Sequence, residues 1–190
     1  MEKILVVSSS AQSVAALSQI LTADRQGSMI ETAESGGQAR RMLLESDYDL
    51  VIINMPLSDE TGVVLGVDIS TQCDSGIIML SPGDNADYVQ EQVEDYGVFV
   101  LPKPLNKQSL HQTTRFVSAS RKRILRLRAQ QSELQKKLED VKVVGRAKCC
   151  LIQYLNMTEP QAHRHIEKQA MDLRTSRRIV AENIIKTYER

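Results

Sequence analysis

Short apolar runs rich in β-branched residues alternate with helical patterns through the first half of the chain. The apolar runs are residues 3–7, 28–33, 49–54, 76–80 and 98–101, and the helical patterns are 11–24, 36–46, 84–96 and 106 onward. Strands that are apolar along their whole length are buried on both faces, and helices between them indicate a parallel order. The pattern therefore predicts an α/β doubly wound fold with a five-stranded parallel sheet. The least regular helix is expected at 60–73, because Gly62 and Gly66 interrupt it.

Polar residues follow four of these five strands. They are Ser8 and Ser9, Asn54, Ser81 and Lys103. In an open parallel sheet the carboxyl ends of the strands meet at one edge, where ligands commonly bind. These side chains either cap strand ends and hydrogen-bond Lys103, or form a pocket for a ligand or a docking surface for a partner protein.

The loops "NMPLSDETG" (54–62) and "VLPKP" (100–104), together with the strand order, resemble a response-regulator receiver domain. That family has a flavodoxin-like fold and takes part in two-component signalling. Its fourth strand ends in Ser or Thr and its fifth in Lys-Pro, which Ser81 and Lys103-Pro104 match. The resemblance implies a sensor or regulatory protein as a partner of this domain.

Three positions depart from the receiver pattern. Asn54 stands where the family has its phosphoryl-accepting aspartate, and Ser8 and Ser9 stand where an acidic pair holds Mg²⁺. An amide oxygen is a poor nucleophile toward phosphorus, and hydroxyls supply no anionic oxygen for the metal. Val100 also replaces the usual aromatic residue, with Phe99 adjacent. We therefore expect a pseudo-receiver without phosphotransfer, and neither an enzyme nor a protein with a metal or cofactor.

The two halves of the chain carry opposite charge. Residues 1–120 hold 7 Lys and Arg against 16 Asp and Glu, whereas residues 121–190 hold 17 against 8. A basic segment attracts polyanions, so nucleic acid is the first partner to consider for the C-terminal part, with an anionic membrane as the competing idea. No apolar run has the length of a membrane span and the start lacks the features of a signal peptide, which predicts a cytoplasmic protein without a membrane partner. Cys73, Cys149 and Cys150 lack metal-like spacing and are expected to be reduced.

A long helix without Pro or Gly is expected from Leu110 to Gly145. Apolar residues recur along it at coiled-coil spacing, with Gln131 as the polar member: Ile124, Leu127, Leu134, Leu138 and Val141. This seam either packs against its own domain or pairs with a second chain, and its narrowness favours a homodimer.

Two helix starts follow the long helix. Thr158, Pro160 and Gln161 form an N-terminal signal, and a second lies at Thr175-Ser176. The pattern predicts a small three-helix bundle made of the end of the long helix to about Leu155 and helices at 159–172 and 176–188.

Residues 145–185 resemble an ANTAR domain, an RNA-binding antitermination module. The matching residues are Ala147-Lys148, Ala162, Arg164, Ala170-Met171-Asp172, Arg174, Ser176 and Val180-Ala181. The family implies dimers that bind paired stem-loops in nascent RNA and prevent terminator formation. Combined with the positive charge of the module, it implies RNA contacts at Ala147, Lys148, Arg164, Lys168, Ala170, Arg174, Ser176, Arg177 and Arg178.

The sequence thus predicts a receiver-like domain at 1–118, a coiled-coil linker at 119–143 and an ANTAR module at 144–190. The expected function is a dimeric regulator of transcription antitermination that binds stem-loops in mRNA leaders. The alternative is a DNA-binding or protein-scaffold regulator that uses the same basic helices.

Overall fold

The computed structural model describes residues 2–24 and 27–188. The chain divides into two compact units, Met1–Leu125 and Arg126–Arg190. The long helix α5, Lys107–Leu155, contributes residues to both units.

The first unit is built on a five-stranded sheet with the order β2-β1-β3-β4-β5, in which all neighbours are parallel. The strands are β1 (Lys3–Val7), β2 (Met29–Ala33), β3 (Leu50–Asn54), β4 (Gly76–Pro82) and β5 (Phe99–Lys103). Every residue of β3 is buried, as are most residues of β1 and β4. The predicted doubly wound parallel sheet is confirmed.

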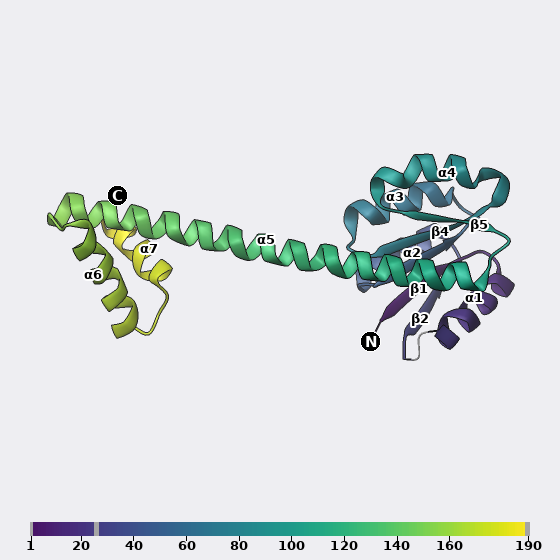
Figure 1. The fold of residues 1–190 in the computed structure, drawn as a ribbon, viewed down its shortest axis with the longest axis horizontal. Coiled ribbons are helices and arrows are strands. Elements are labelled where there is room, and N and C mark those ends of the chain that lie inside the picture. The colour runs from purple at the N-terminus through teal and green to yellow at the C-terminus, as the bar shows by residue number, and fades with distance from the viewer. Residues whose placement is uncertain (1, 25–26, 189–190) are drawn as a thin grey trace. The chain divides into compact units, whose positions relative to one another are not determined.

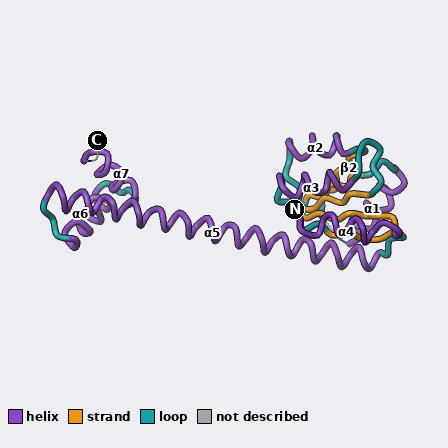
Figure 2. The backbone as a smooth tube through the Cα atoms, turned by 90° about the horizontal axis from the view of Figure 1, so that it is seen from above, coloured by secondary structure: helices purple, strands orange, loops and turns teal. Residues whose placement is uncertain are grey.

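Helices cover both faces of this sheet (Figures 1 and 2). They are α1 (Ala11–Asp24), α2 (Gly36–Glu45), α3 (Gly62–Gln72), α4 (Ala86–Val93) and the first part of α5, with 3₁₀ turns at Gly83–Asn85 and Glu94–Tyr96. Leu65 and Val89 pack α3 and α4 into one core cluster, whereas Leu17 and Val117 pack α1 and α5 into the other. The two clusters lie on opposite faces, because successive strand residues point to opposite sides.

Helix α3 corrects the expectation of an irregular segment, because it is a continuous helix of 11 residues. Its glycines allow close packing: a Cβ on Gly62 would lie 2.6 Å from Cγ of Met55, and one on Gly66 would lie 3.0 Å from Sδ of Met79. The cost of glycine in a helix is therefore offset by contact with the sheet.

Strands β4 and β5 run further than predicted. Ser81 pairs with Pro102, and Pro82 with Lys103, at the end of the parallel ladder. Ser81 and Lys103 therefore belong to the carboxyl ends of β4 and β5 and do not follow them. The backbone hydrogen bonds between the two strands fix both positions.

The second unit contains the end of α5, α6 (Glu159–Asp172) and α7 (Arg177–Tyr188). The amide of Thr158 donates to Oε1 of Gln161 at 2.9 Å, and the amide of Ile179 donates to Oγ of Ser176 at 3.3 Å. The predicted capping residues thus form hydrogen bonds at the starts of both helices. The core of this unit consists of small and branched residues where the helices meet: Ala147, Cys150, Leu151, Ala162, Ile166, Ala170, Val180, Ala181 and Ile184.

Candidate functional sites

Asn54 and Ser8 form a buried hydrogen-bonded pair at the carboxyl ends of β3 and β1. Nδ2 of Asn54 donates to Oγ of Ser8 at 2.8 Å, and the amide of Ser10 donates to the same oxygen at 3.2 Å. Ser81 is fully buried, and its hydroxyl donates to the carbonyl of Pro82 at 3.3 Å. Among the described residues, no buried side-chain nitrogen or oxygen lacks a hydrogen-bond partner. The polar groups at this edge are therefore used by the fold itself.

Lys103 corrects one detail of the expected network. Its ammonium donates to the carbonyl of Met55, and no bond joins it to the serines or to Asn54 in the described part of the chain. Burial lowers the pKa of Lys103. Ser9 is exposed, and its hydroxyl donates to the carbonyl of Pro56 at 3.4 Å. Lys103 and Ser9 thus hold the backbone of the segment that leaves β3.

The loop after β3 is tied to the start of α2, a connection that the sequence reasoning missed. The carboxylate of Asp59 accepts bonds from the amides of Gly36 at 3.0 Å and Gly37 at 2.9 Å. These amides lower the pKa of Asp59, with Gly37 as the larger influence. Glu60 forms a bidentate salt bridge with Arg40, and Arg40 also contacts Asp68. The two neighbouring glycines at a helix start were the signal for this anchor, since an anion is stabilised at a helix N-terminus.

Phe99 lies on β5 beside the position where an aromatic residue was expected. Its ring packs edge-on against Phe116 of α5, with centroids 5.2 Å apart and planes at 72°. Both rings are partly exposed, whereas Val100 contacts the core. The aromatic pair therefore belongs to the surface of the first unit.

Three of the six basic residues predicted to bind RNA are paired with acids inside the second unit. Lys148 contacts Glu159 at 2.5 Å, and Arg177 contacts Glu167 at 3.3 Å. Arg178 contacts both Asp140 and Glu182 at 2.9 Å. These three cations line a groove of about 630 Å³ between α5, the α6–α7 turn and the start of α7, together with Val141, Gly145, His163 and Ser176. Each cation of the groove already has a counter-charge nearby.

The other three cations have no such pair with any described residue. Arg164 and Lys168 are exposed one turn apart on α6, and Arg174 is exposed in the following turn. Within residues 2–24 and 27–188, none of the three forms an ion pair or a side-chain hydrogen bond. Arg174 has a φ of +50°, and the next amide, of Thr175, donates to the carbonyl of Ala170 at 2.9 Å. A left-handed residue that ends a helix is usually glycine, so an arginine here bears a conformational cost.

The apolar seam of α5 is exposed in the single chain. The exposed fractions are 50% for Ile124, 54% for Leu127, 65% for Leu134, 49% for Leu138 and 69% for Val141. About half or more of each side chain therefore remains available to another surface.

Comparisons with known proteins match one family model to the first unit and another to the second unit. The response regulator receiver domain matches residues 4–115 and the ANTAR domain matches residues 132–185. The chain belongs to the response regulator receiver domain family. It is 27% identical over 159 residues to "Transcriptional regulatory protein PdtaR" of Mycobacterium tuberculosis strain H37Rv, covering 84% of this chain and 78% of that protein.

Solved receiver structures share the fold of the first unit. The signal receiver domain of an HD domain-containing protein from Pseudomonas fluorescens Pf-5 has a TM-score of 0.59 at 24% identity, covering 66% of this chain and 92% of that one. A response regulator receiver domain protein from Clostridium thermocellum has a TM-score of 0.58 at 23% identity, covering 66% and 99%. In its domain composition the chain is thus a receiver domain followed by a match to the ANTAR domain.

The receiver's strand-end residues do not fit a Mg²⁺ site. Ser8, Ser9, Asn54 and Ser81 offer hydroxyl and amide groups, and Lys103 adds a positive charge. Mg²⁺ is held in proteins by carboxylates and waters in octahedral geometry, and none of these five groups is anionic. In the described part of the chain, no cluster of three or more His, Cys, Asp or Glu could hold a metal ion.

Two of the predicted RNA-contact residues of the ANTAR module are buried. Ala147 is fully buried and Ala170 is 7% exposed, because both pack where helices of the bundle cross. Ser176 is exposed, and its hydroxyl caps α7. Ala147 and Ala170 therefore belong to the core of the module, whereas Arg164, Lys168 and Arg174 lie on its surface.

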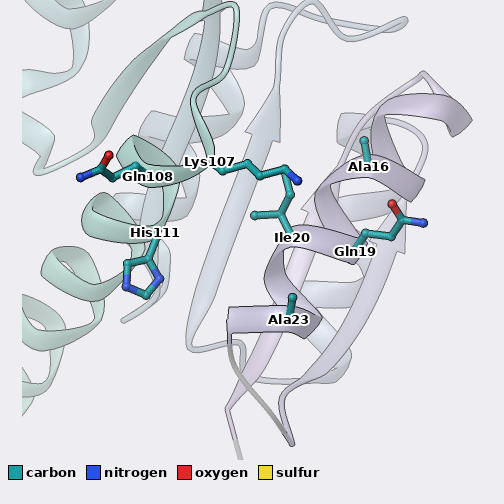
Figure 3. A pocket seen from close by; sticks show the side chains of 7 residues that line it. All are labelled: Ala16, Gln19, Ile20, Ala23, Lys107, Gln108 and His111. Atoms are coloured by element: carbon teal, nitrogen blue, oxygen red, sulfur yellow. The ribbon is translucent and has the colours of Figure 1, made fainter.

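The receiver domain also has a hollow of about 490 Å³ between α1 and the start of α5. Figure 3 shows Lys107 reaching from α5 toward Ile20 on α1, with Ala16 and Ala23 along the same helix. It contains none of the strand-end residues. Helices that could span a bilayer are absent from the described residues.

Proposed function

We propose that this chain is a transcription antitermination regulator that binds stem-loops in mRNA leaders as a dimer. The ANTAR match and the likeness to a transcriptional regulatory protein support the regulatory part. The cations Arg164, Lys168 and Arg174 carry the RNA part, because they project from one small module and have no counter-charge among its described residues. Phosphate oxygens and splayed loop bases are the partners that such groups recognise in RNA.

The dimer forms through the seam of α5. Seam positions recur every three or four residues from Ile124 to Val141, all of them apolar except Gln131, and the apolar side chains remain exposed in the single chain. Burying such a stripe against its copy removes apolar surface from water and places two ANTAR modules side by side. Two modules suit a leader that carries paired stem-loops.

The receiver domain acts as a scaffold or input surface without phosphotransfer. Asn54 cannot attack phosphorus as a carboxylate does, and Ser8 and Ser9 cannot hold the metal. The bond between Asn54 and Ser8 supports this proposal, since it makes the amide part of the domain's buried network. A sensor or another regulatory protein would then act through a surface of the receiver instead of through phosphorylation.

Three functional segments follow from this scheme: a pseudo-receiver at 1–118, a linker at 119–143 and the RNA-binding module at 144–190. The Asp140–Arg178 contact ties the end of the linker to the module. The linker is therefore the segment through which dimerisation fixes the two modules.

Competition binding tests the RNA proposal. Labelled RNA hairpins are titrated with the full chain, with duplex DNA of equal charge as competitor, across a salt series. We expect the hairpins to bind more tightly at every salt concentration, with log K falling linearly with log salt. Equal competition by duplex DNA favours a DNA-binding regulator, and no binding of either nucleic acid favours a protein scaffold.

Phosphorylation is tested separately. Incubation with a small phosphodonor and Mg²⁺, followed by intact mass measurement, should leave the receiver unmodified. A stable acyl-phosphate on Asp49 or Asp59 would show that another carboxylate serves as acceptor and would overturn the pseudo-receiver.

A further inference from the structure

The seam of α5 is bordered by cations on both sides. With Leu127, Leu134 and Val141 at one core position of the heptad and Leu138 at the other, the flanking positions can be assigned along the helix. Between residues 123 and 149 the flanks are Arg123, Arg128, Gln130, Gln135, Lys137, Lys142, Val144 and Cys149. These positions contain no acid. Coiled coils that pair by charge usually place acids and bases together at these sites.

Pairing two copies would bring like charges together. In a parallel, in-register pair, Lys137 faces the partner's Lys142, and the symmetric contact repeats on the other side. Arg123 and the partner's Arg128 form the same kind of contact nearer the start of the seam. In an antiparallel pair, each flanking position faces the equivalent flanking position on the same side of the partner's seam. These positions again contain only cations and neutral residues. Association is therefore opposed by charge in either direction.

The surrounding acids do not remove the charge of Lys137 and Lys142. Glu133 contacts Lys137 at 2.7 Å, but the two side chains are 65% and 68% exposed, so solvent and salt screen the pair strongly. Asp140 is taken by Arg178. Lys142 is exposed, and the structure gives it no acidic partner among the described residues.

We infer that these flanks form a second binding site for RNA, a double row of cations that is completed only when two copies pair along the seam. It extends over about 28 Å of helix between residues 123 and 142, taking a rise of 1.5 Å per residue. Its ligand is the phosphodiester backbone, without base readout. Bound RNA neutralises the charge that opposes association, so RNA binding and dimerisation reinforce each other by linkage.

This inference rests on the proposed dimer and RNA binding, but its signature differs from theirs. RNA binding weakens as salt rises. Association of the free protein should instead strengthen as salt rises, because screening removes the repulsion between the flanks. These two opposite salt dependences distinguish the effect of the flanking cations from RNA binding by Arg164, Lys168 and Arg174 of the ANTAR module.

The test is sedimentation equilibrium of the full chain, with an RNA of about 20 uridines as the probe because it forms no hairpin. For the wild type we expect the dimer Kd to fall by about threefold to tenfold between about 50 and about 300 mM KCl. At the lower salt, the oligouridine should lower the Kd by a similar factor. Lys142→Glu places an acid opposite the partner's Lys137, so its dimer should be tightest at low salt and respond little to the probe. Lys136→Glu makes the same charge change at an outward position and should behave like the wild type.

Several outcomes would overturn the inference: a wild-type Kd that stays constant or rises with salt, no tightening by oligouridine, or equal behaviour of the two Glu variants. A monomer under every condition overturns the inference together with the proposed dimer. If the oligouridine tightens the dimer but hairpins bind no better than duplex DNA, the flanking site stands and the proposed stem-loop recognition falls.

Discussion

The polar side chains of the receiver's strand ends and those of the ANTAR module's outer face are used in opposite ways. Asn54 and Ser8 point inward and satisfy each other at 2.8 Å, and Lys103 is bound to a backbone carbonyl. Arg164 and Lys168 point outward and have no internal partner in the described part of the chain. A group that already has its partner must lose it before it can bind a ligand, whereas a solvated cation gives up only water and counterions. This difference supports our proposal that the ANTAR module binds the ligand and that the receiver edge is a scaffold.

The largest expected effect concerns the seam that joins two ANTAR modules in the proposed dimer. Replacing Leu134 and Leu138 together by Lys puts charge into an apolar interface, and we expect the dimer Kd to rise at least about a hundredfold, roughly 3 kcal/mol. Sedimentation at micromolar concentration measures it. The matched control is Ala129→Lys with Ser132→Lys, which adds the same charge to exposed positions off the seam. A dimer that survives the first pair of changes would place the interface elsewhere.

The second prediction separates free from paired cations within the ANTAR module. Arg164→Ala should weaken hairpin binding by about 1–3 kcal/mol and reduce the salt slope by about one if a phosphate contact is lost. Lys148→Ala should cost less, because Lys148 already contacts Glu159 at 2.5 Å and must give up that pair to bind RNA. Titration of a labelled hairpin with each variant measures the difference.

Lys136→Ala is the control for both variants, since Lys136 is exposed on α5 away from the module. Arg190, which could serve the same purpose, lies outside the described residues. Equal losses for Arg164→Ala, Lys148→Ala and the control would indicate general polyanion binding and remove the distinction between the two groups of cations.

The sequence predicted the fold well where periodicity and capping agree. The five apolar runs became the five strands, and α6 has the expected bounds of Glu159–Asp172, because Thr158 and Gln161 form a local signal that needs no tertiary information. Helix α3 was expected to be irregular, since glycine propensity is a local property. Its regularity comes from contact with Met55 and Met79 in the folded domain.

The sequence predicted which residues lie at each candidate site, but not which of them form hydrogen bonds or ion pairs with each other. The sequence placed Asn54, Ser8 and Lys103 at one edge of the sheet, but which donor meets which acceptor depends on strand register and on distances of a few tenths of an ångström. Similarly, the basic residues of the ANTAR module were recognised as one set. Their division into paired and free cations requires knowing that Arg178 lies against Asp140, 38 positions away in sequence.

The third prediction tests whether the strand-end network is structural. Asn54→Ala removes the buried amide and the shorter of the two bonds that Oγ of Ser8 accepts, so we expect a loss of about 1–2 kcal/mol in the free energy of unfolding of the receiver. Urea unfolding followed by circular dichroism measures it. Ser9→Ala is the matched control, since Ser9 is exposed and its bond of 3.4 Å is long; we expect a change within about 0.5 kcal/mol. An Asn54→Ala protein as stable as the wild type would reopen this edge as a ligand pocket.

The smallest effect concerns the loop after β3, which Asp59 ties to the start of α2. The amides of Gly37 and Gly36 lower the pKa of Asp59, so the charged carboxylate is bound more tightly in the folded state than in the unfolded state. The contribution of the charged carboxylate to the free energy of unfolding is fully present above the unfolded pKa of about 4. It is lost as pH falls through the lower folded pKa. Asp59→Asn should therefore be less stable than the wild type near neutral pH, and the difference should shrink below about pH 4. Glu91→Gln removes the same charge from an exposed position beyond the first turn of α4, where no backbone amide of the described residues contacts the carboxylate, and it should not reproduce this pH dependence. Thermal unfolding of the three proteins between pH 3 and 7 gives the comparison. A stability difference that stays constant over this range would mean that Asp59 acts by shape alone, and that the loop after β3 is not held to α2 by charge.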